Sequence, residues 1–208
     1  MQGSVHAELF EVLRSFFPQP PFECFASPLN CYFPAFGSAF EDLDFHFGSV
    51  GDFMNLTVDE GICEANPPFS PGLMSLMVDR IEHNIARADK KKKSLSFCVV
   101  VPTAKNSSTR RPAAQQFALE SFNRMVNGPT CRLHIVLEAR KHGYIEGAQH
   151  MRPTRFKDSS YDTSVILIQS KAARNAATLD VDAFEKAVRS AFASKHTEEL
   201  QSRRLKEG

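Results

Sequence analysis

Four consecutive residues, Asn66-Pro67-Pro68-Phe69, carry groups that could position an amine for chemistry. Prolines lack an amide proton and have a fixed φ, so this turn is stiff and its carbonyls face outward. The Asn66 amide oxygen and the Pro67 carbonyl can both accept hydrogen bonds from one exocyclic amino group, and the Phe69 ring can stack on a base. An amine held in this way keeps its nitrogen lone pair aimed at a methyl donor. The alternative interpretation is a proline turn that caps a helix.

The flanking residues indicate where this motif lies in a fold. Residues 61–65 form a short, mostly apolar run that predicts a buried strand, and residues 70–88 have helical spacing, with Leu73, Met77 and Ile81 on one face. The motif therefore follows the carboxyl end of a strand, where open α/β sheets place their ligand crevice.

A second group of candidate residues precedes the motif. Residues 22–26 predict a first strand, and the turn at 27–30 that follows has no glycine. Such a turn is a poor cradle for phosphate, but a methyl donor such as S-adenosylmethionine carries no phosphate. We predict a second strand that ends near Phe40, with the acids Glu41, Asp42 and Asp44 at its tip. An acid in that place commonly binds the two hydroxyls of a ribose; the alternative is a solvated acidic turn.

The remaining pattern predicts an α/β fold with a doubly wound sheet of about seven strands between two helical layers. Asn66 is expected at the end of the fourth strand. Residues 95–102 give the clearest strand. Residues 132–137 and 163–168 predict two more, which we expect to form an antiparallel pair. Helices are expected at residues 4–17, 115–126 and 179–200. We expect one catalytic domain over residues 1–208, with a core at about 3–170 and a C-terminal helix and charged tail at 171–208.

The distribution of charge points to a polyanionic partner. Residues 1–89 contain three Lys or Arg and 13 Asp or Glu, so they are acidic. Residues 90–208 contain 22 Lys or Arg and 11 Asp or Glu, so they are basic. Residues 139–162 read as a basic loop interleaved with aromatic residues, which suits phosphates and a stacked base. The candidate RNA contacts in this loop are Arg140, Lys141, Tyr144, Gln149, His150, Arg152 and Arg155. Lys90–Lys93 form a competing basic cluster, which we expect to be a solvated turn at the opposite end of the sheet.

Composition excludes several other classes of protein. Five cysteines, mostly in apolar contexts, indicate reduced core thiols of an intracellular protein, and no Cys or His cluster has metal-binding spacing. No apolar run is long enough to span a bilayer, and the first residues are not those of a signal peptide. Tryptophan is absent, which excludes any module built on that residue.

Taken together, these segments resemble the catalytic domain of the phosphorylated CTD-interacting factor family, the cap-specific adenosine N6-methyltransferases. The resemblance rests on residues 23–33 (ECFASPLNCYF), on Phe47-Gly48-Ser49 and on the motif at 66–69, and it covers about residues 3–170. The eleven-residue run at 23–33 is far more specific than the short motif alone.

The resemblance implies a Rossmann-like class I methyltransferase that uses S-adenosylmethionine and acts in the nucleus. Its substrate would be the 2′-O-methyladenosine next to the 7-methylguanosine cap of messenger RNA. By position, the resemblance implies catalytic roles for Asn66, Pro67, Pro68 and Phe69. It implies donor-binding roles for Glu23, Ala26, Ser27, Pro28, Asn30, Asp42 and Asp44.

Two features of the family have no counterpart in the sequence. Members usually carry a WW module, which docks on the phosphorylated tail of RNA polymerase II, and a helical region that helps to build the cap pocket. We therefore expect a protein partner or a further region to complete the cap pocket, and no polymerase docking by these residues. The alternative functions are N6-adenine methylation of DNA or internal RNA, methylation of a glutamine amide, and RNA binding without catalysis. The basic loop at 139–162 favours nucleic acid over protein as the substrate.

Overall fold

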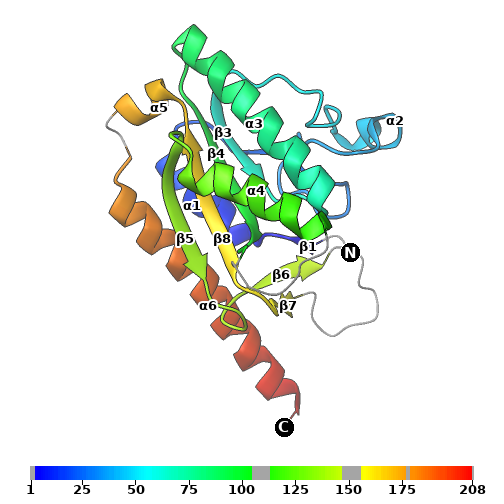
Figure 1. The fold of residues 1–208 in the computed structure, drawn as a ribbon. Coiled ribbons are helices and arrows are strands. Elements are labelled where there is room, and N and C mark those ends of the chain that lie inside the picture. Colours follow the sequence, from blue (N-terminus) through cyan, green and yellow to red (C-terminus); the bar gives the residue numbers. More distant parts are fainter. Residues whose placement is uncertain (1–2, 105–112, 147–155, 177–178, 208) are drawn as a thin grey trace.

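A central five-stranded sheet carries the fold in the computed structural model, which describes residues 3–104, 113–146, 156–176 and 179–207 (Figure 1). The strand order is β2-β3-β4-β8-β5. The strands are β2 (Phe22–Glu23), β3 (Gly61–Ala65), β4 (Leu95–Pro102), β8 (Thr163–Gln169) and β5 (Cys131–Leu137). The first three are parallel to one another, and β8 runs antiparallel to both β4 and β5. The predicted antiparallel pair at 132–137 and 163–168 is thus confirmed.

Two isolated bridges extend this sheet beyond β2. Phe36 bridges Glu23 in parallel orientation, and Ser49 bridges Phe36 in the same way. Neither segment is long enough to form a strand. The second strand predicted to end near Phe40 is therefore wrong in detail, because a short helix, α2 (Glu41–Asp44), occupies that place and the bridge lies four residues earlier.

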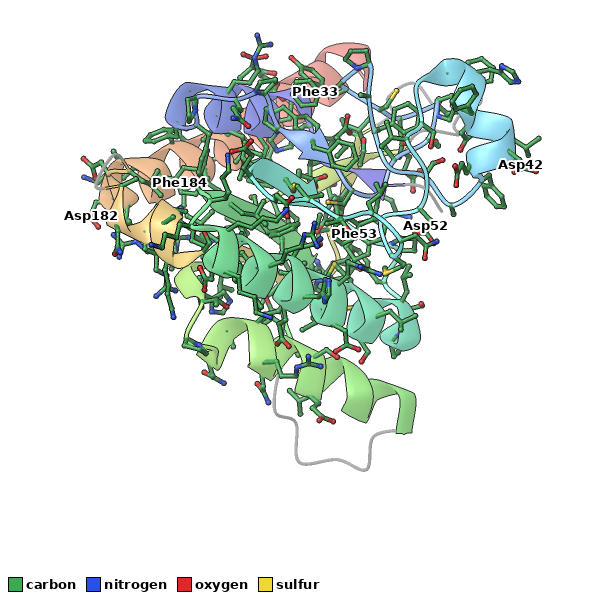
Figure 2. All side chains as sticks on the ribbon, turned by 90° about the horizontal axis from the view of Figure 1, so that it is seen from above. Phe33, Asp42, Asp52, Phe53, Asp182 and Phe184 are labelled. Atoms are coloured by element: carbon green, nitrogen blue, oxygen red, sulfur yellow. The ribbon has the colours of Figure 1, made fainter. Side chains whose placement is uncertain are left out.

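Helices cover both faces of the sheet and make three layers (Figure 2). α3 (Pro71–Lys91) and α4 (Ala113–Asn127) lie on one face, and α1 (Ala7–Phe16) and α6 (Val181–Glu207) lie on the other. β4 packs against both helical layers, because its residues are mostly apolar and are buried along nearly the whole strand. Its alternate side chains point to opposite faces: Phe97 and Val99 pack with the α3 layer, whereas Cys98 and Val100 pack with the α1 and α6 layer.

A second, smaller sheet stands beside the carboxyl ends of the parallel strands. Its order is β1-β6-β7, all antiparallel, with β1 (Gly3–Ser4), β6 (Gly143–Glu146) and β7 (Phe156–Asp158). The sequence predicted a loop over residues 139–162, so the β6 and β7 strands are a correction. They are short, and β6 also pairs with residues far away in the chain, so local periodicity did not reveal them.

The remaining short elements are the 3₁₀ helix η1 (Phe45–Phe47) and the helix α5 (Lys171–Asn175). The lysine cluster lies where α3 ends and precedes β4, at the end of the sheet opposite Asn66, as predicted. Lys91 is paired there with Asp59 and Lys93 with Glu60. No helix in the described parts of the chain combines the length and apolarity needed to cross a membrane.

Candidate active site

A cavity of about 510 Å³ opens at the carboxyl ends of β2 and β3. From β2 the bridged segments at Phe36 and Ser49 continue to one side, whereas β3 and β4 continue to the other. β2 and β3 therefore flank the point where the strand order reverses, which is the usual ligand site of open α/β sheets. The cavity is lined by Gly3, Cys24–Ser27, Asn30, Ser38–Phe40, Asp44, Asp52, Asn66–Phe69, Leu73, Tyr144, Glu146 and Lys157–Tyr161.

Asn66 directly follows β3 and is 6% exposed. Its Nδ2 donates a hydrogen bond to the carbonyl of Gly3 at 3.1 Å, and because a carbonyl only accepts, this contact fixes the orientation of the amide. Its Oδ1 is buried and has no hydrogen-bond partner within the described protein. A buried acceptor without a partner costs about 1–3 kcal/mol. Asn66 thus offers a fixed acceptor in the lining of the cavity.

The next three residues are held by the start of α3. Ser70 is the N-cap of this helix, with its Oγ accepting from the amide of Leu73 at 3.4 Å, and Pro71 occupies the first turn. The carbonyl of Pro68 accepts from the amide of Ser70 at 2.7 Å. Pro67 is buried, whereas the Phe69 side chain is 40% exposed. The helix cap therefore presents the Phe69 ring at the rim of the cavity.

Three aromatic rings gather at this rim. The ring centroids of Phe69 and Tyr144 are 6.1 Å apart, those of Phe69 and Tyr161 are 5.9 Å apart, and those of the two tyrosines are 6.4 Å apart. Tyr144 comes from β6 and Tyr161 from the residues that follow β7. The small sheet therefore completes an aromatic surface that the motif begins.

A directed chain of hydrogen bonds fixes Tyr144. His142 Nδ1 lies 2.8 Å from the carbonyl of Glu138, so this nitrogen must carry the proton. Burial lowers the pKa of His142, and in the neutral ring Nε2 accepts from the Thr163 hydroxyl at 2.7 Å. The Thr163 oxygen in turn accepts from the Tyr144 hydroxyl at 2.8 Å. The Tyr144 oxygen is left as an acceptor, and burial raises the pKa of its hydroxyl well above the usual value.

The opposite wall is built from loop backbone. The amide of Ala26 donates to the carbonyl of Gly37 at 2.8 Å, and the amide of Gly37 donates to the carbonyl of Glu23 at 2.7 Å. A Cβ at Gly37 would lie 2.6 Å from the carbonyl oxygen of Cys24, so only glycine fits this close approach. Asn30 Oδ1 accepts from both the amide and the hydroxyl of Ser27, at 2.7 and 2.9 Å, and closes the turn.

The charges of the cavity are mainly negative. Asp44, Asp52, Glu146 and Asp158 line it, and Lys157 is the single cation among the described lining residues. Lys157 Nζ lies 3.2 Å from Glu146 Oε1. A second depression, of about 670 Å³ and more open to solvent, lies between α3 and α4, far from these groups. No group of three or more His, Cys, Asp or Glu side chains in the described residues could hold a metal ion.

The chain is similar in sequence to known proteins over most of its length. The sequence model described as "Phosphorylated CTD interacting factor 1 WW domain" matches residues 1–147. The mRNA (2′-O-methyladenosine-N(6)-)-methyltransferase of Mus musculus is 36% identical over 172 residues, and that of Homo sapiens is 35% identical over 172 residues. Each alignment covers 82% of this chain and 22% of the relative, so the chain spans about a fifth of the length of the curated relatives it matches. The chain belongs to the phosphorylated CTD interacting factor 1 family.

Several of the site residues predicted from the sequence lie on the cavity. These are Ala26, Ser27, Asn30, Asp44, Asn66, Pro67, Pro68, Phe69 and Tyr144. They come from four separate segments of the chain, and the fold brings them together around one space.

Other predicted site residues lie elsewhere. The Glu23 carboxylate accepts from the amides of Tyr32 and Phe33 at 2.7 and 2.8 Å, so it shapes the loop that follows β2. Pro28 and Asp42 are not among the lining residues. Arg140 and Lys141 are exposed, and Lys141 is paired with Glu138. Gln149, His150, Arg152 and Arg155 fall outside the described residues.

Some lining residues were not predicted from the sequence. Asp52 and Ser38 lie in irregular loops with no periodic pattern. Gly3 contributes only its backbone carbonyl, which every residue type has, so the sequence could not identify it. Tyr161 belongs to the predicted basic loop but is not one of its candidate contacts. One signal could have indicated a hairpin: Tyr144 and Glu146 alternate along one segment, and Lys157 and Ser159 alternate along the segment that pairs with it.

Proposed function

We propose that this chain transfers a methyl group from S-adenosylmethionine to the N6 amine of an adenosine in RNA, and that this adenosine is the 2′-O-methyladenosine next to the cap of messenger RNA. One observation carries the proposal: the buried Oδ1 of Asn66 has no hydrogen-bond partner among the described residues, while its Nδ2 is held by Gly3. That oxygen accepts an N–H, and an exocyclic amine supplies one. The names of the two relatives identify the same reaction in those proteins.

The cavity suits the methyl donor. Its volume falls within the range of about 300–1,000 Å³ usual for small-molecule sites. Four carboxylates line it with one lysine, which favours a cationic ligand, and S-adenosylmethionine carries a sulfonium and an ammonium. Ala26, Ser27 and Asn30 would hold the donor from the end of β2, and Asp44 and Asp52 would bind its hydroxyls or its positive charge. When bound, the donor supplies an electrophilic methyl group.

The residues of the chain then act mainly by orientation. Asn66 Oδ1 and the Pro67 carbonyl would accept the two N–H bonds of the amine, so that its lone pair faces the donor side of the cavity. Phe69, with Tyr144 and Tyr161 beside it, would hold the base by stacking. No side chain is needed as a strong base, since the proton of the methylated amine passes to water. Orientation and fixed dipoles of this kind lower a barrier without covalent catalysis.

We also propose the Rossmann-like class I arrangement for the fold. In support, the two bridged segments and the five strands together make seven passes of the chain across the sheet, with β3 as the fourth pass along the sequence. Residues 1–208 would act as one catalytic domain. Capped RNA would lie over the small sheet, with Lys157, Arg140 and Lys141 as described cations near its path, and with Gln149, His150, Arg152 and Arg155 as further contacts. The place of action would be the nucleus, as the family resemblance implies.

The decisive experiment uses the purified chain, a capped RNA that begins with 2′-O-methyladenosine, and S-adenosylmethionine with an isotopically labelled methyl group. Mass spectrometry of the digested RNA should show the label on N6 of the first nucleotide. Asn66→Ala should lower the initial rate of labelling at least 30-fold, and Asn123→Ala, a change of an exposed asparagine on α4, should leave it unchanged. Uncapped RNA and a DNA oligonucleotide of the same sequence test the alternatives. Binding of the donor without any transfer to these substrates would favour a non-catalytic subunit instead.

A further inference from the structure

The outer side of α2 and η1 exposes a group of large apolar side chains, here called the α2–η1 surface. Its members are Phe40, Leu43, Phe45, Phe47 and Val50. The first four are each 61–67% exposed, and Val50 is 48% exposed. No residue of α2 or of η1 is buried. Single exposed apolar residues are ordinary, but five within eleven positions mark a contact surface.

Backbone contacts, rather than burial, hold this surface in shape. Gly48 has a φ of 104°, and a Cβ there would lie 1.9 Å from the carbonyl oxygen of Pro34. Its amide donates to Phe45, and the amide of Val50 donates to Phe36 at 2.9 Å. A helix of this length is not stable in isolation. Figure 1 shows α2 standing out at the side of the molecule, beyond the central sheet. The fold therefore fixes a short helix whose apolar side chains stay exposed in the described part of the chain.

The charge around this surface defines what could cover it. Residues 15–79 contain no Lys or Arg and nine Asp or Glu, and three of these acids, Glu41, Asp42 and Asp44, belong to α2. An RNA backbone would be repelled from such a surface. A second copy of the chain would bring the same negative charge against itself. A segment that is apolar on one face and basic along its edges is complementary in both respects.

We propose that the α2–η1 surface docks a basic amphipathic helix of a separate polypeptide. Its apolar face would cover Phe45 and Phe47, and its Lys or Arg residues would pair with the acids of α2. Phe40 and Asp44 also line the cavity, so the docked helix lies at the donor-side rim. This inference does not depend on the proposed reaction, because docking can be measured without methyl transfer.

The test uses a synthetic peptide about 18 residues long, five helical turns, with Leu on one face and Lys on the other. Calorimetric titration of the whole chain should show binding that weakens as salt is raised. A peptide of the same composition in scrambled order, and one with Glu in place of Lys, should each bind at least tenfold more weakly. Phe45→Ser with Phe47→Ser should lower affinity at least tenfold, as loss of central aromatic contacts does. Asp42→Lys should lower it about threefold, the usual effect of one exposed ion pair.

Two matched variants control for general effects. Leu76→Ser removes an equally exposed apolar residue from α3, and Asp182→Lys reverses a charge at the far side of the molecule from Asp42 (Figure 2). Both should bind the peptide as the unmodified chain does. The α2–η1 variants should keep the thermal midpoint, because they change no buried side chain. Equal binding of the scrambled peptide, or equal losses in the control variants, would overturn the proposal. The proposal would also be overturned if the unmodified chain self-associated in sedimentation experiments, or bound RNA, and the variant with Phe45→Ser and Phe47→Ser did not.

Discussion

The two walls of the cavity are built by different means. The wall after β2 consists of irregular loops joined by backbone hydrogen bonds, such as those of Ala26 and Gly37, and its charged groups are carboxylates. The wall formed by the motif at 66–69 and the β6–β7 sheet consists of side chains. The groups on this wall are the Asn66 amide, three aromatic rings and the hydrogen-bond chain from Tyr144 to His142. Each of them is supplied by side chains of a particular type.

This difference matters for how the site would tolerate change. A wall held by backbone bonds keeps its shape when most of its side chains are replaced. The exceptions are close approaches such as Gly37 and side chains that bind the loop backbone, such as Glu23 and Asn30. On a wall made of side chains, replacing any one of them removes a contact on which the function depends. We therefore expect substitutions on the side-chain wall to affect the reaction and the base strongly, and substitutions on the loop wall to affect donor affinity in smaller steps.

The largest effect is expected from Asn66→Ala. Removing one oriented acceptor in a desolvated site should raise the barrier by about 2–4 kcal/mol, or roughly 30- to 1,000-fold in rate. Donor affinity should change less than twofold, since Asn66 serves the acceptor amine. Single-turnover rates beside calorimetry with S-adenosylmethionine separate the two. If donor affinity fell as much as the rate, the two walls would not be separate in function.

Phe69→Ala comes next. Loss of the ring should cost about 1–3 kcal/mol of RNA affinity, the usual value for one stacked base. Phe69→Tyr should preserve it, because the stacking face is retained. The side chain is 40% exposed, so thermal stability should hardly change in either variant. RNA affinity measured by fluorescence anisotropy tests this, and an unchanged affinity in a folded Phe69→Ala chain would rule out stacking by this residue.

The sequence predicted one wall better than the other. The apolar runs that became β3, β4 and β8 are buried on both faces, so composition alone identified them and placed Asn66 at a strand end. The β6 and β7 strands were not predicted because they are only four and three residues long. Their neighbour β1 lies more than a hundred residues away in the chain, which no local pattern reports.

The loop wall was predicted in outline only. The turn at 27–30 was placed correctly on the cavity because it follows a strand, but Glu23 was assigned to the donor although its carboxylate is used by the amides of Tyr32 and Phe33. Asp52 is not predicted because it opens a turn within an irregular segment, where its carbonyl accepts from the amide of Asn55 at 2.9 Å. In such segments the chain path depends on tertiary hydrogen bonds, for example from Ser38 to the carbonyl of Gly51, which residue types do not encode.

On the loop wall, Asp52→Asn should have a moderate effect. Asp52 Oδ1 already accepts from the amide of Met54 at 3.0 Å, and an amide oxygen can replace it there, so the loop should keep its shape. Loss of the negative charge should weaken S-adenosylmethionine binding by about 1 kcal/mol, or roughly fivefold. RNA affinity should not change. Asp59→Asn, at the opposite end of β3, is the matched control. Equal losses in both variants would indicate a long-range charge effect instead of a contact.

A pH-dependent effect on stability is expected where Glu23 and Glu64 lie side by side on β2 and β3. Glu64 is 2% exposed, and its Oε1 has no partner in the described protein. Burial first, and then the charge of Glu23, raise the pKa of Glu64 well above its ordinary value of 4.5. The folded state therefore keeps the proton after the unfolded chain has released it. The resulting stability is fully present below pH 4.5 and declines as the pH rises through the folded pKa.

Glu64→Gln removes this dependence, since the amide is neutral at every pH and similar in shape. The free energy of unfolding from urea titrations at pH 5, 6, 7 and 8 should fall with pH in the unmodified chain, by up to about 1.4 kcal/mol per pH unit. It should fall less steeply in the variant. Glu23 retains part of the slope, because burial also raises its pKa against the two amides that lower it. Glu60→Gln, an exposed carboxyl paired with Lys93, is the control and should leave the slope unchanged. If Glu64→Gln also left the slope unchanged, Glu64 would be ionised in the folded protein, and β3 would carry a buried negative charge two residues before Asn66.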